Sequence, residues 1–142
     1  MRAIGLLFLA CAAIAQAPSY QPVGSVDQIM LAMSYPLSDA LLYIERDPPK
    51  TDKDWTTLQY DAMMLAESGN LLMMPGRARD QERWIQDAKL MVDAGAAALK
   101  AARARDMEAI LGLNDQIVAS CVTCHEDYRP SYRRRRQQQN AK

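Results

Sequence analysis

The chain has 142 residues, enough for one domain and a tail, and 49% apolar with 24% charged residues is typical of a globular protein. Seventeen basic residues balance 17 acidic ones, so the chain lacks the basic excess of a nucleic-acid-binding protein. One Phe, six Gly and few β-branched runs argue against a large β-sheet. Three cysteines and one histidine leave little material for a disulfide scaffold or an all-protein metal cage.

Residues 1–15 have the features of a cleaved signal peptide. Arg2 supplies a positive start, and the apolar stretch over residues 4–14 is too short to span a bilayer. Small residues also allow cleavage after residue 17, but Pro18 would then be an awkward first residue. A lipid anchor would need Cys11, whose preceding residues match a lipoprotein signal poorly. The sequence therefore predicts a soluble, exported, periplasmic protein.

The first predicted helix begins at Ser25, because Ser25 and Gln28 have the spacing of a capping box. Its apolar residues recur at helical spacing, at Val26, Ile29, Met30 and Met33. Pro36 should kink or interrupt this helix, which then continues over Leu37–Arg46 until Pro48-Pro49 ends it.

Three more helices are expected along the chain. The second starts at its N-cap Thr51 and stops at Pro75-Gly76. The third covers roughly Asp80–Arg103, and the fourth runs from about Asp106 to Tyr128, before Pro130. Short connections make neighbouring helices antiparallel, so residues 25–132 are predicted to form an all-α, up-and-down four-helix bundle.

The chain ends in a basic segment. From Arg129 onward there are five Arg, one Lys and no acidic residue, whereas residues 16–128 carry 10 basic and 17 acidic residues. The run Arg133–Arg136 and the glutamines after it predict a disordered tail over residues 133–142. Attraction to anionic lipid or to an acidic redox partner stays open for this tail.

The fourth predicted helix carries the chemistry, in Cys121-Val122-Thr123-Cys124-His125. C-x-x-C-H is the attachment signature of a c-type haem. Two thiols about one helical turn apart can each reach a vinyl group on the same porphyrin edge, and the imidazole that follows can ligate iron.

Three other interpretations of these residues are less well supported. A thioredoxin-like dithiol uses the same C-x-x-C but normally follows a strand, and none is predicted here. A zinc site would need a fourth ligand, and no further Cys or His remains after signal cleavage. A structural disulfide would leave His125 unexplained.

With the motif at the end of four predicted helices, the sequence resembles the class II cytochromes c, the group of cytochrome c′ and cytochrome c-556. The resemblance rests on the C-terminal position of the motif and on its continuation through Glu126-Asp127-Tyr128-Arg129, and it covers about residues 25–132. It implies a four-helix bundle with one covalent haem c against the C-terminal helix. It makes His125 the proximal iron ligand, and Cys121 and Cys124 the thioether anchors.

The other face of the iron decides the function that the resemblance implies. In the c-556 type a Met from the first helix ligates iron, which gives a six-coordinate electron carrier. In the c′ type an apolar side chain covers that face and leaves iron able to bind nitric oxide or carbon monoxide. Met30 and Met33 share a helix face. We expect Met30, which lies farther from Pro36, with Met33 as second choice; a site without a Met ligand stays open.

Two further residues have alternative roles. Arg129, one turn beyond His125, could tune the haem site or complement the helix dipole. Gly95, in the third predicted helix, could let a porphyrin approach the backbone or let two helices pack closely.

No catalytic constellation accompanies the motif, so we expect an electron-transfer protein and not an enzyme. The expected partners are exported or membrane-bound redox proteins, with no nucleic acid; a homodimer stays open. The alternatives are the gas-binding cytochrome c′ and, last, a haem-free helical interaction protein with a redox-active dithiol.

Overall fold

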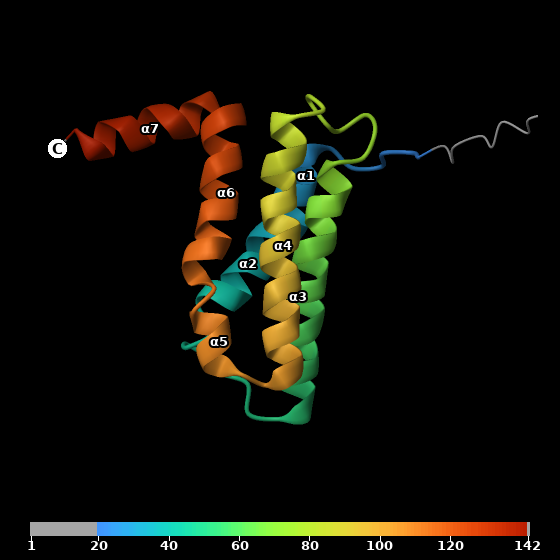
Figure 1. Cartoon of the computed structure of the whole chain (residues 1–142), viewed down its shortest axis with the longest axis vertical. Helices are drawn as coiled ribbons and strands as arrows, with labels where there is room; N and C mark the ends of the chain where they lie inside the picture. Colours follow the sequence, from blue (N-terminus) through green and yellow to red (C-terminus); the bar gives the residue numbers. More distant parts are fainter. Residues whose placement is uncertain (1–19, 142) are drawn as a thin grey trace, which may run out of the picture.

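The fold is that of a computed structural model, which describes residues 20–141. Its elements are α1 (Val26–Ile29), the π-helical segment η1 (Met30–Ser34), α2 (Tyr35–Leu42), α3 (Asp52–Leu72), α4 (Arg83–Ala104), α5 (Met107–Leu111), α6 (Asn114–Tyr128) and α7 (Pro130–Asn140) (Figure 1). This part of the chain contains helices and no strand, so the predicted all-α class is confirmed for it. None of its helices combines the length and the apolar character needed to cross a membrane. The predicted signal peptide lies outside the described residues.

Local side-chain caps start two of the helices where the sequence predicts. Ser25 Oγ accepts the backbone N–H of Gln28 at 3.2 Å, and the Gln28 side chain accepts the N–H of Ser25 at 2.9 Å. Thr51 and Asp54 make the same reciprocal pair at the start of α3. Each pair satisfies backbone donors that have no partner inside the helix.

Pro36 does not interrupt the first helical run; the disturbance lies just before it. Residues 30–34 form a π-helical turn, in which the N–H of Tyr35 bonds to the carbonyl of Met30. A proline ring crowds the carbonyl four residues earlier and offers no N–H, and a wider turn relieves that conflict. Helical structure then continues to Leu42, four residues short of the predicted end at Arg46.

The second half of the chain differs from the prediction at two points: the start of the third helix and a break inside the fourth. The third helix begins at Arg83 and not at Asp80, whose carboxylate instead accepts the N–H groups of Glu82 and Trp84. The predicted helix from 106 to 128 is divided into α5 and α6 at Gly112 and Leu113. Glycine weakens a helix interior, which accounts for the break at this point.

Helices α3 and α4 pack closely along their length (Figure 1). Gly95 makes this approach possible, because a Cβ on it would lie 2.5 Å from the backbone nitrogen of Ala66. Of the two roles considered for Gly95, the structure assigns close helix packing. Trp84 fixes one end of the pair, where its indole N–H donates to the backbone carbonyl of Leu72 at 2.7 Å.

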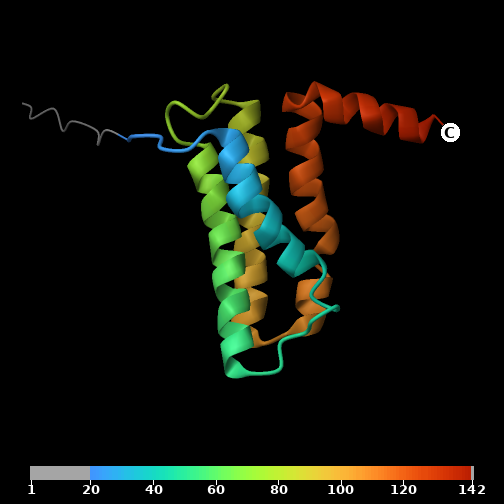
Figure 2. The ribbon, with the colours of Figure 1, turned by 180° about the vertical axis from the view of Figure 1, so that it is seen from behind.

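The remaining helices complete the core. Figure 2 shows the run from α1 to α2 crossing obliquely beside α3, so that its α2 end approaches α6. The largest side chains that are fully buried come from all of these segments: Leu41, Leu65, Leu72, Ile110 and Ile117. The C-terminal end of α6 lies at the same end of the molecule as α1 and the start of α4 (Figures 1 and 2).

The basic tail was predicted to be disordered, but most of it is helical in the structure. Residues 130–140 form α7, which projects away from the other helices (Figure 1). Pro130 stands in its first turn, where a proline N–H is not needed, and Arg and Gln are good helix formers. The ion pair between Arg136 Nε and Glu126 Oε1, at 3.2 Å, links α7 to α6.

Candidate functional site

The C-x-x-C-H segment lies on the last two turns of α6. Cys121 and Cys124 are three residues apart on one helix and hence about one turn apart, and both are free, partly buried thiols. His125 follows directly and is also partly buried. The three predicted attachment and ligand residues are therefore together on one helix, reachable from solvent and not consumed by a disulfide.

The surroundings of the two thiols keep them protonated. Burial raises the pKa of Cys121. Burial, followed by the negative charges of Asp87 and Asp127, raises the pKa of Cys124 to about 11. A redox dithiol instead needs a lowered thiol pKa and an electropositive setting. The local electrostatics thus disfavour the thioredoxin-like interpretation of this motif.

The imidazole of His125 is held in its neutral form. Burial, and then the positive charge of Arg129, lower the pKa of His125. A neutral imidazole is the form that ligates a metal ion. The ring of Tyr132 in α7 meets the imidazole edge-on, with centroids 5.5 Å apart. Sequence reasoning gave Tyr132 no role, because it ended the last helix at Tyr128, before Pro130.

The start of α4 and the residues before it hold the end of α6. The hydroxyl of Tyr128 donates to the carboxylate of Asp80, and the rings of Tyr128 and Trp84 meet edge-on at 4.8 Å. Arg79 donates to the carbonyl of Tyr128 at 3.3 Å. Burial and the bond to Asp80 raise the pKa of Tyr128 to about 12, so the phenol stays a hydrogen-bond donor.

A second, charged connection lies one turn along α4. Arg83 Nε is 2.6 Å from Asp127 Oδ2 on α6 and 3.5 Å from Asp87 Oδ1 on α4. The Asp87 side chain is only 3% exposed, and no group in the described part of the chain donates to its Oδ2. Burial and the charge of Asp127 raise the pKa of Asp87, while Arg83 opposes them. No sequence signal distinguishes Asp87 from the exposed acids of the same helix.

The two candidate distal ligands lie on the first helical run. Met30 opens the π-helical turn and Met33 lies within it. Both are partly buried and pack against the hydrophobic core. Met30 follows α1 directly, and α1 lies at the same end of the molecule as the last turn of α6, which carries His125 (Figure 2).

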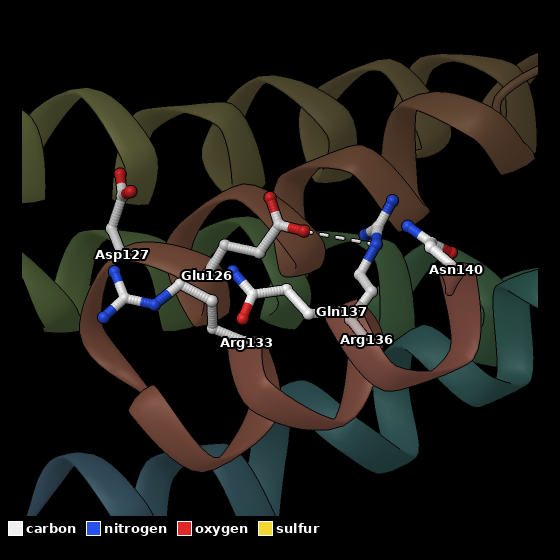
Figure 3. A pocket seen from close by; sticks show the side chains of 6 residues that line it. All are labelled: Glu126, Asp127, Arg133, Arg136, Gln137 and Asn140. Atoms are coloured by element: carbon white, nitrogen blue, oxygen red, sulfur yellow. Dashed lines mark ion pairs between the residues drawn. The ribbon is translucent and has the colours of Figure 1, made fainter. Parts of the chain in front are cut away.

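A groove of about 290 Å³ separates α6 from α7 (Figure 3). Its lining combines two acids of α6 with polar and basic residues of α7: Glu126, Asp127, Arg133, Arg136, Gln137 and Asn140. Glu126 and Arg136 pair across it, so much of the charge is already compensated. Within residues 20–141 no group of three or more His, Cys, Asp or Glu side chains is placed to hold a metal ion.

Comparison with protein-family models, with curated proteins and with solved structures gave no match for this chain. The functional argument therefore depends on the motif, its electrostatics and its place in the fold.

Proposed function

We propose that this protein is an exported mono-haem c-type cytochrome that transfers single electrons between redox proteins. The observation that supports it most is C-x-x-C-H on α6, within a described part of the chain that is all-helical, with both thiols free and partly buried. Cys121 and Cys124 would hold one covalent haem c, and His125 would be its proximal ligand. When bound, haem c supplies an iron that alternates between ferric and ferrous states.

The residues around the motif fit this role. Burial and the Arg129 charge keep His125 neutral, so its ring nitrogen is free to ligate without first losing a proton. Tyr132 restricts the ring from one side. The contacts of Tyr128 with Asp80 and Trp84 fix the turn of α6 that follows the imidazole. A fixed ligand changes its geometry little when one electron arrives, which suits electron transfer.

For the architecture we propose the four-helix bundle of the class II cytochromes c. The run from α1 to α2 would be the first helix, α3 and α4 the second and third, and α5 with α6 the fourth. Their successive directions along the long axis support this arrangement (Figures 1 and 2). Met30 would be the distal ligand, with Met33 as the second choice, because both lie on the first of these helices.

A gas-binding cytochrome c′ is the second candidate. The packing of Met30 and Met33 against the hydrophobic core favours it, because a methionine side chain held in the core is less available to ligate the iron. The iron would then be five-coordinate and open to nitric oxide or carbon monoxide.

Export belongs to the same proposal, because covalent haem attachment of this kind takes place in exported proteins. It depends on residues 1–15 acting as a signal peptide, and cleavage there would leave Gln16 as the first residue. Mass spectrometry of periplasmic protein tests this. An intact N-terminus on cytoplasmic protein would contradict it.

The decisive experiment is expression together with the c-type haem maturation apparatus, followed by haem staining of a denaturing gel and by absorption spectra. Stain that stays with the chain, and is lost when Cys121 and Cys124 are both replaced by alanine, is the expected result. No stain, where a control cytochrome matures, would refute both haem proposals. A low-spin spectrum that becomes high-spin in Met30→Ala, and not in Met33→Ala, would identify Met30 as the ligand. A high-spin wild type that shifts with carbon monoxide would favour the second candidate.

A further inference from the structure

Asp87 is a buried carboxylate with too few partners. Its side chain is 3% exposed, its Oδ1 lies 3.5 Å from Arg83 Nε, and its Oδ2 receives no hydrogen bond from the described part of the chain. An unpaired buried polar group is destabilising, so such groups are few and each needs an explanation.

The charges around Asp87 do not cancel. Arg83 lies closer to Asp127 than to Asp87, at 2.6 Å against 3.5 Å, so one guanidinium serves two carboxylates. Asp80 adds a third carboxylate where α4 meets α6, and Arg79 adds the second guanidinium. With three acids and two bases, the contact between the start of α4 and the end of α6 carries net negative charge.

This negative charge acts at the haem-attachment motif. Asp127 lies two residues after His125 and three after Cys124 on α6, and Arg83 joins it to Asp87 on α4. The buried carboxylate of Asp87 therefore lies beside the turn of α6 that carries Cys124 and His125. An electron added to a haem attached at this turn would be repelled by that carboxylate. Asp87 is shielded from water, so its charge is screened less than that of an exposed acid.

We propose that Asp87 is a positioning residue for the haem's redox equilibrium, whose buried negative charge lowers the reduction potential of a haem attached at Cys121 and Cys124. This inference rests on the proposed function. Reduction brings one electron from a donor and adds one negative charge to the site, and Asp87 opposes that addition. Arg83 acts in the opposite sense, because its positive charge favours the reduced state.

The test is the midpoint potential of the haem-loaded full chain, measured at neutral pH by spectroelectrochemical titration. Asp87→Asn keeps the shape of the side chain and removes its charge, so the midpoint should rise. Asp93→Asn is the matched control, on the same helix but 53% exposed and paired with Lys89, and its midpoint should stay at the wild-type value. Arg83→Gln, at a side chain 59% exposed, should lower the midpoint.

The directions of the shifts separate an electrostatic role from a structural one. Removing a structural contact would move Asp87→Asn and Arg83→Gln the same way, because both variants loosen the same connection between α4 and α6. Opposite shifts support the inference. An unchanged or lowered midpoint in Asp87→Asn, or a raised one in Arg83→Gln, overturns it. If Asp87→Asn does not mature, the sign of the Arg83→Gln shift decides. A wild type without covalent haem refutes the proposed function, whereas a loaded wild type with an unshifted Asp87→Asn refutes this inference alone.

Discussion

Replacing Gly95 by alanine would place a methyl group where the backbones of α3 and α4 touch. The added Cβ would lie 2.5 Å from the nitrogen of Ala66, 2.9 Å from its Cα and 3.0 Å from the carbonyl oxygen of Ala62. These are backbone atoms, so no side chain can turn away and the two helices must separate. Overpacking of this kind costs about 1–3 kcal/mol, and the better helix propensity of alanine returns about 0.5–1 kcal/mol.

The net expectation for Gly95→Ala is a loss of about 1–2 kcal/mol in the free energy of unfolding. For a domain of this size that lowers Tm by about 3–10 °C, measured by far-UV circular dichroism. Gly112→Ala is the control, because its Cβ would meet only carbonyl oxygens at 3.4 and 3.5 Å, which is ordinary contact. An unchanged Tm in Gly95→Ala would refute the close packing of α3 and α4. If its haem spectrum changed instead, Gly95 would be a point of porphyrin approach.

Three smaller changes probe other parts of the molecule. Trp84→Phe removes the 2.7 Å hydrogen bond from the indole N–H to the buried carbonyl of Leu72. We therefore expect the free energy of unfolding, measured by urea titration, to fall by about 1–3 kcal/mol, and an unchanged urea midpoint would contradict this. Because the folded-state pKa of Asp87 is raised, its contribution to stability falls as pH rises above the unfolded-state pKa of about 4. Asp87→Asn should therefore gain stability relative to wild type between pH 4 and pH 7, and a pH-independent difference would argue against this. Arg136→Gln breaks an ion pair between half-exposed groups and should change stability by less than about 0.5 kcal/mol; a loss above about 1 kcal/mol would mean that α7 is firmly docked.

Local sequence signals predicted the fold well where the interaction is itself local. The caps at Ser25 and Thr51 join residues three apart, so their spacing alone specifies them. The break at Gly112 could have been anticipated from the weak helix propensity of glycine, yet the apolar period continues through it. The later start of α4 was not predictable, because Asp80 divides its two oxygens between the helix start and Tyr128 on another helix.

The candidate site divides in the same way. Cys121, Cys124 and His125 are recognised as candidates from their spacing, since covalent haem attachment needs such residues close together in sequence. Asp87 resembles any acid on a solvated helix face, and only the packing of α4 against α6 shows that it is buried. Arg83 likewise could be expected to be solvated, but it connects Asp87 to Asp127 across the two helices. Charged contacts between residues that are far apart in the chain cannot be identified from a single sequence.

The two sides of the proposed iron site differ in how firmly the chain specifies them. His125 is held through its own helix, with Tyr132 on one side and the Tyr128 contacts one turn further on. Met30 instead opens a π-helical turn, and exchanging a π-turn for an α-turn shifts the preceding residues by one position, about 100° around the axis. If a methionine ligates the iron, as we propose, the register of this turn determines which sulfur faces it. In the proposed site the motif therefore specifies the proximal ligand, while the choice between Met30 and Met33 depends on how the first helix accommodates Pro36.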